Sequence, residues 1–187
     1  MIDVPLPLVG FGMAVAAGLG YLAGRLSRRP DGPSVLDEDA ADAVLASAFE
    51  RLSTPRFALV LRVDAVATWK RTHGATALDL FVRRLRQALE ETLPDAVNVQ
   101  TGDAEVTAVC DGEPQRAAVV LDALKARRFR LPSGVETLVT CSLGTAAEEP
   151  GVTIEDLRSR AAAAVRAAQE SGRWQAFTAD SRGTRAL

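Results

Sequence analysis

The chain has 187 residues and a formal net charge of −2. This balance excludes the strongly basic surface with which nucleic-acid-binding proteins contact phosphates, so no nucleic-acid partner is expected. About 150 residues remain beyond an apolar N-terminal segment, enough for one domain with its own core. Cys110 and Cys141 lie in apolar, strand-like runs without metal-ligand spacing. Both are expected to be buried, reduced thiols.

The N-terminal segment has the features of a membrane anchor. Residues 4–24 carry no charge. As a helix, a segment of this length can cross roughly 30 Å of hydrocarbon. Arg25, Arg28 and Arg29 follow the apolar run, and no Lys or Arg precedes it. A cleaved signal peptide would carry its positive charges first. We therefore expect residues 1–29 to form a single-pass anchor in the inner (cytoplasmic) membrane, with the N-terminus outside and the rest of the chain in the cytoplasm.

Small residues recur every four positions along this segment, at Gly12, Ala16, Gly20 and Gly24. Such residues share one helix face and let two helices approach closely, which predicts a homodimer. The alternative is that the stripe reflects only the abundance of glycine and alanine in membrane spans.

Residues 30–54 are interpreted as a linker and a leading helix. Pro30 and Pro33 interrupt any helix continuing from the anchor. Ser34 and Asp37 then form a capping-box pattern that opens a new helix. The anchor is therefore expected to act as a tether and not as a rigid connection to the domain.

The rest of the chain alternates between strand-like and helix-like patterns. The first elements are a buried strand at 56–64, an amphipathic helix with apolar residues from Leu78 to Leu93, a hairpin around Gly102 and a helix at about 113–128. A strand at 137–146 follows, and then a helix that is capped by Thr153 and Asp156 and stops at Gly172. The last elements are a short strand at 174–177 and a polar tail at 178–187, which is expected to be mobile. This order predicts an α+β domain with a mixed central sheet.

Three fragments of this domain, with the hairpin stretch VQTGDAEV between them, resemble one known family. They read RVDAVATWKRTHGATALD, VTCSLGTA and AAAAVRAAQESGR. In their order and separation they are similar to the GGDEF domain of diguanylate cyclases, which make cyclic di-GMP from two GTP on a palm-like fold related to nucleotide cyclases. The resemblance implies a GGDEF-like α+β domain at residues 55–177, its mixed sheet flanked by helices and preceded by one transmembrane helix.

Two alignments place the family's signature on the hairpin. Matching residues 101–105 puts Glu105 where the family buries a phenylalanine, and burying an unpaired carboxylate costs on the order of several kcal/mol. Matching residues 102–106 puts Val106 at that apolar position instead. The second alignment is therefore preferred.

In the preferred alignment Gly102 keeps the first glycine and Asp103 replaces the second. Aspartate adopts left-handed conformations more readily than most residues, so the exchange is tolerable. Ala104 replaces the first acid of the signature, and Glu105 keeps the second.

The resemblance implies a site in which carboxylates on two neighbouring strands hold two metal ions. Here Arg62 stands at the ligand position of the first strand and Ala104 at that of the hairpin. Asp64 lies two residues after Arg62, on the same strand face, and is expected to be its ion-pair partner. No catalytic residue and no metal ligand is therefore assigned, and Mg²⁺ is expected only if nucleotide binding remains.

The nucleotide-contacting positions are also altered. Lys70 replaces the asparagine that binds guanine, although Asp79 is retained. Ala67 and Gln169 replace two lysines. The family's Arg-x-x-Asp inhibitory pattern reads Thr92 to Asp95, without its arginine. The candidate remnants of a nucleotide site are Arg62, Asp64, Lys70, Asp79, Gly102, Asp103, Glu105 and Arg173.

The sequence thus favours a membrane-tethered, catalytically inactive GGDEF-like domain that acts through a protein partner in bacterial signalling. A second hypothesis is a receptor domain that binds GTP or cyclic di-GMP without turnover, with Arg62 holding phosphate and Asp79 reading guanine. A residual diguanylate cyclase, with Asp64 and Glu105 as a new metal pair, is the third.

Overall fold

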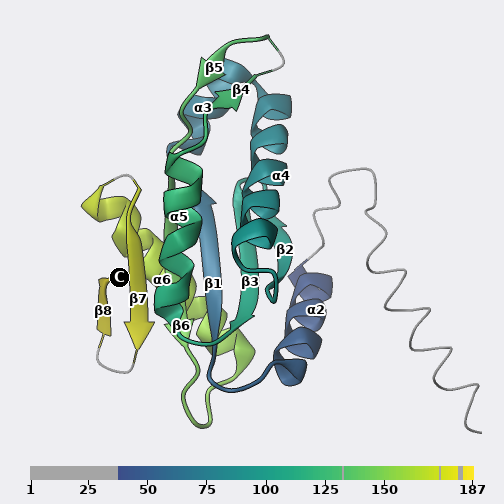
Figure 1. Cartoon of the computed structure of the whole chain (residues 1–187), viewed down its shortest axis with the longest axis vertical. Helices are drawn as coiled ribbons and strands as arrows, with labels where there is room; N and C mark the ends of the chain where they lie inside the picture. The colour runs from purple at the N-terminus through teal and green to yellow at the C-terminus, as the bar shows by residue number, and fades with distance from the viewer. Residues whose placement is uncertain (1–37, 132, 173, 181–182) are drawn as a thin grey trace, which may run out of the picture. The chain divides into compact units, whose positions relative to one another are not determined.

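The computed structural model describes residues 38–131, 133–172, 174–180 and 183–187 (Figure 1). The expected anchor at residues 4–24, its small-residue stripe, the Ser34–Asp37 capping box and Arg173 lie outside these residues, so those expectations stay predictions. Within the described part of the chain, no helix combines the length and the apolar character needed to cross a membrane.

A six-stranded mixed sheet forms the centre of the domain. Its strand order is β2-β3-β1-β6-β7-β8. β1 pairs antiparallel with both β3 and β6, β6 pairs parallel with β7, and β8 closes the edge antiparallel to β7. The bounds are β1 Arg56–Val63, β2 Val97–Gly102, β3 Glu105–Asp111, β6 Cys141–Ala147, β7 Ala176–Asp180 and β8 Gly183–Ala186. The α+β class with a mixed sheet is thereby confirmed.

Helices cover both faces of this sheet (Figure 1). α2 (Glu38–Arg51) and α6 (Ile154–Ser171) pack on one face, and α4 (Ala75–Thr92) and α5 (Ala118–Lys125) pack on the other. Successive residues of a strand point to opposite faces, so alternate residues of β1 enter different cores. The first core takes Phe57, Leu59, Leu61 and Val63, and the second takes Ala58 and Val60.

Several elements form as the sequence predicts. The strand at 56–64, the helix through Leu78 and the hairpin at Gly102 are all present. α6 begins with the expected capping box, in which the Thr153 hydroxyl accepts a hydrogen bond from the Asp156 amide at 3.2 Å. Both cysteines are buried free thiols, and burial raises the pKa of Cys110 to about 12.

Between α4 and β6 the structure corrects the sequence analysis twice. The helix expected at 113–128 is a short 3-10 turn, η1 (Pro114–Ala117), followed by α5. The strand expected at 137–146 starts only at residue 141, because the chain first forms a separate two-stranded ribbon, β4 (Phe129–Arg130) and β5 (Glu136–Thr137). In β4, Phe129 packs edge-on against Phe81, with ring centroids 4.5 Å apart.

Strand structure also replaces the mobile tail expected at residues 178–187. Thr178 and Ala179 are buried in β7, and β8 adds a hairpin to it. The Leu187 amide donates to the Ala176 carbonyl at 2.9 Å. A further helix, α3 (Val66–His73), follows β1 directly and was not anticipated. Its Trp69 belongs to the first core.

Gly144 sets the distance between β6 and α6. A Cβ at this position would lie 2.2 Å from the Ala161 carbonyl oxygen and 2.4 Å from the Val165 amide nitrogen. Both are backbone atoms of α6, so relief would require the whole helix to move. The glycine therefore allows the helix to approach the sheet closely.

We expect Gly144→Ala to lower the free energy of unfolding by at least about 2 kcal/mol, because overpacking against backbone cannot relax locally. Gly102→Ala is the matched control, since its Cβ would meet only the Glu105 Cβ at 3.8 Å. It should stay within about 0.5 kcal/mol of the unmodified chain. Urea unfolding of both variants measures this, and equal stabilities would contradict the close packing.

Candidate functional site

The candidate site lies where β1 ends and β3 begins. Arg62 and Glu105 are direct neighbours in the β1–β3 pairing, so their side chains leave the same face of adjacent antiparallel strands. Arg62 is the residue before the last of β1, and Glu105 is the first of β3.

Arg62 and Glu105 form a part-buried ion pair. The Arg62 Nε donates to Glu105 Oε2 at 2.8 Å, and Nη2 donates to the same oxygen. The other carboxylate oxygen, Oε1, accepts from the Thr101 hydroxyl at 2.9 Å. Thr101 also shares a hydrogen bond with Thr107 at 2.9 Å. Both oxygens of Glu105 are thus engaged by the protein itself.

Ala104 precedes this glutamate in the hairpin turn. Its side chain is buried, and its carbonyl accepts a hydrogen bond from the Val63 amide at 3.0 Å. Val106 is fully buried in the first core, whereas the Glu105 side chain keeps 22% of its exposure. This burial agrees with the alignment that places Val106 at the apolar position.

Asp64 does not pair with Arg62, and that expectation was wrong. Its Oδ1 accepts from the Ser142 hydroxyl at 2.8 Å and from the Gln169 amide at 3.1 Å. Arg62 and Asp64 share one face of the sheet, but Arg62 turns to Glu105 on β3, whereas Asp64 turns to Ser142 on β6, the strand on the other side of β1. The Asp64 amide pairs with the Thr140 carbonyl at 2.9 Å, which holds the carboxylate toward β6 and α6. Its buried Oδ2 has no hydrogen-bond partner among the described residues.

Lys70 and Asp103 form a second, more exposed ion pair between α3 and the hairpin turn. The Lys70 Nζ lies 2.6 Å from Asp103 Oδ2. This hydrogen bond is the main reason that the pKa of the Asp103 carboxyl lies below its usual range. The Lys70 ammonium is therefore turned toward an acid of the protein itself.

The retained acids of the resemblance differ in their surroundings. Asp79 is half-buried on α4 and makes no hydrogen bond or ion pair with any other described residue. Asp95, from the inhibitory pattern, accepts from Arg116 Nη1 at 3.1 Å and Nη2 at 3.0 Å. This hydrogen bonding lowers the pKa of Asp95.

These contacts do not fit a divalent metal ion. A guanidinium occupies the space beside Glu105 Oε2, and its positive charge would repel the ion. The neighbouring position contributes only the methyl group of Ala104. Among the described residues, no group of three or more His, Cys, Asp or Glu side chains is arranged as a metal site.

Some members of the site were missed by the sequence analysis. Thr101 holds the Glu105 carboxylate and shares a hydrogen bond with Thr107, and Ser142 holds the Asp64 carboxylate. Thr107 and Ser142 are polar residues within otherwise apolar strands, and this exception is the signal that could have singled them out.

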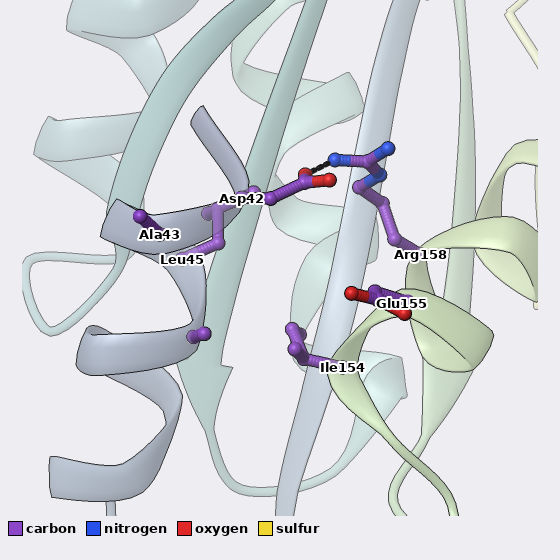
Figure 2. Close-up of a pocket in the computed structure, with 7 residues that line it drawn as sticks. Asp42, Ala43, Leu45, Ile154, Glu155 and Arg158 are labelled. Carbon is purple, nitrogen blue, oxygen red and sulfur yellow. Dashed lines mark ion pairs between the residues drawn. The ribbon is translucent and has the colours of Figure 1, made fainter. Parts of the chain in front are cut away.

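A cavity lies away from these residues, between α2 and the first turns of α6. Its volume is about 180 Å³. Figure 2 shows that Asp42 and Arg158 form an ion pair beside it, while Leu45 and Ile154 supply apolar lining. None of the candidate nucleotide-site residues lines it.

Solved structures share the fold. The GGDEF domain of DgcB from Caulobacter crescentus, in complex with c-di-GMP, matches with TM-score 0.70 and 22% identity over 82% of this chain and 96% of that one. Diguanylate cyclase SiaD of Pseudomonas aeruginosa, in complex with its activator SiaC, matches with TM-score 0.72 and 22% identity over 88% and 66%. An active GGEEF domain of a Vibrio cholerae diguanylate cyclase matches with TM-score 0.65 and 16% identity over 78% and 97%.

No family model and no curated protein matches the chain. The similarity to solved structures shows that the domain has the GGDEF palm-like fold. The resemblance of the sequence fragments predicted this fold.

We predict that Arg62 and Glu105 are energetically coupled. Arg62→Met and Glu105→Gln should each destabilise the domain, and the double variant should lose less than the sum. A coupling of about 1–2 kcal/mol is expected for charged groups that are mostly withdrawn from water. Urea unfolding of the four proteins gives this value. A coupling near zero, as in exposed pairs, would show that the two side chains do not hold each other.

Proposed function

We propose that this chain is a catalytically inactive GGDEF-like domain that acts as a protein-interaction or regulatory module in cyclic di-GMP signalling. The observation that carries the proposal is the ion pair between Arg62 and Glu105, on the two strands where the family binds metal. A fixed cation holds the remaining acid, and Ala104 stands where the other acid would be.

The chemistry explains why this exchange argues against turnover. Diguanylate cyclases, which this domain resembles, depend on metal ions to offset triphosphate charge and to activate the attacking hydroxyl. Arg62 cannot supply that positive charge while Glu105 neutralises it. Gln169, at the position of a family lysine, is neutral and is bound to Asp64. Among the residues that the structure describes, the site therefore offers neither a metal cradle nor a free cation cluster for a triphosphate.

Support for a protein partner comes from what the domain retains. A core of buried apolar residues lies on each side of β1. The domain can therefore present a folded surface to a partner even though the metal-ligand positions are altered. Among the similar structures, SiaD is in complex with its activator SiaC.

We further propose that residues 4–24 tether the domain to the membrane. Cross-linking of the full chain in membranes would test whether it forms a homodimer there.

A second candidate is a receptor that binds a nucleotide without turning it over. The Arg62 and Lys70 side chains keep 28% and 39% of their exposure, so a phosphate group could approach both from solvent. DgcB is in complex with c-di-GMP. This candidate requires the nucleotide to compete with Glu105 and Asp103 for the two cations, and for that reason it ranks second.

Calorimetric titration of the full chain with GTP and with cyclic di-GMP, each with Mg²⁺, separates the two candidates. The proposed function predicts no heat of binding at millimolar ligand. Binding that Arg62→Ala abolishes and Arg84→Ala leaves unchanged would establish the receptor instead. Arg84 suits the control because it is an exposed arginine on α4 whose guanidinium donates a hydrogen bond to Gln87 and to no other described residue.

A further inference from the structure

The ribbon of β4 and β5 carries an unusual concentration of exposed apolar side chains. Of the large hydrophobic residues that the structure describes, three are exposed, and two of them, Val135 at 57% and Leu138 at 60%, lie immediately before and after β5. Single exposed apolar residues are ordinary, but neighbouring ones mark interaction surfaces.

Other apolar residues of the same segment are buried. Phe129, Leu131 and Val139 are buried in the first core, and the Leu131 amide donates to the Val135 carbonyl at 2.8 Å. The ribbon is therefore fixed to the domain by its inner residues. Its exposed residues are not needed for that attachment.

Positive charge surrounds the apolar residues. Residues 125–139 contain four basic residues and one acid, Glu136. Lys125 pairs with Asp122 and Arg127 pairs with Glu91. Arg128 and Arg130 are exposed and have no ion-pair partner among the described residues, although Glu136 lies opposite Arg130 in the strand pairing.

We propose that the β4–β5 ribbon is a docking surface for anionic lipid headgroups. The long stems of Arg128 and Arg130 would bring their guanidinium groups to lipid phosphates, while Val135 and Leu138 insert at the boundary of the headgroups. Basic residues next to exposed aliphatic ones are the combination that anionic membranes attract.

Size favours a lipid surface over a protein. A stable protein interface buries about 800 Å² on each partner and is anchored by large side chains such as Trp and Tyr. Two aliphatic side chains on a short ribbon are too few for such an interface, whereas weak membrane contact needs only a few apolar and basic groups.

In Figure 1 the ribbon stands at the end of the sheet toward which β1 points, apart from the cavity between α2 and α6. The inference is independent of the proposed loss of catalysis.

The test uses a polarity-sensitive dye on the full chain carrying Val135→Cys. Cys110 and Cys141 are buried, with raised thiol pKa values, and do not compete for the label. The matched control is Val119→Cys, which replaces the third exposed apolar residue, on α5. Both proteins are mixed with phosphatidylcholine vesicles, with and without phosphatidylserine.

We expect a blue shift at position 135 that requires phosphatidylserine, exceeds any shift at position 119, and falls at 1 M salt because the charges are screened. Adding Arg128→Gln and Arg130→Gln should reduce the shift by about twofold or more. Equal shifts at the two positions, or no dependence on phosphatidylserine, would overturn the proposal. The absence of any shift would also overturn it, and would leave a protein as the partner of the ribbon.

Discussion

The ion pair between Arg62 and Glu105 joins two neighbouring strands of the central sheet, β1 and β3. Antiparallel pairing of β1 with β3 makes the two residues direct neighbours, so an arginine at one position necessarily meets the acid at the other. Thr101 engages the second carboxylate oxygen. The charge of the Glu105 carboxylate is thus neutralised from within the chain, and the proposed function rests on this ion pair.

The surrounding polar contacts follow the same principle. Asp64 is satisfied on one oxygen by Ser142 and Gln169, and Asp103 is held by Lys70. Lys70 and Gln169 are thus both directed at acids of the protein itself. The hydrophobic cores do not depend on these polar contacts. Alternate residues of β1 enter the two cores whichever polar residues stand at the end of the strand.

Most of the framework could be predicted from the sequence, because it depends on local patterns. The helical spacing from Leu78 to Leu93, the cap at Thr153 and the apolar run of β1 each specify their own element. The ribbon at Phe129 and the pairing of β8 could not be predicted, since both depend on contacts with distant residues, Phe81 and Ala176. The partner of Asp64 was missed for a similar reason. Strand alternation gives the face of a side chain but not the neighbour that it contacts, and Asp64 contacts Ser142 on β6 and Gln169 on α6 instead of Arg62.

The most direct test of the account restores the two metal-ligand positions. The double variant Arg62→Asp with Ala104→Asp places carboxylates on β1 and in the turn before β3, beside Glu105, and thermal unfolding with and without Mn²⁺ reports whether an ion binds. The account predicts a rise in unfolding temperature with Mn²⁺ for the double variant and none for the unmodified chain, because binding to the folded state alone stabilises it. Stabilisation of the unmodified chain by Mn²⁺ would contradict the claim that Arg62 takes the place of the metal.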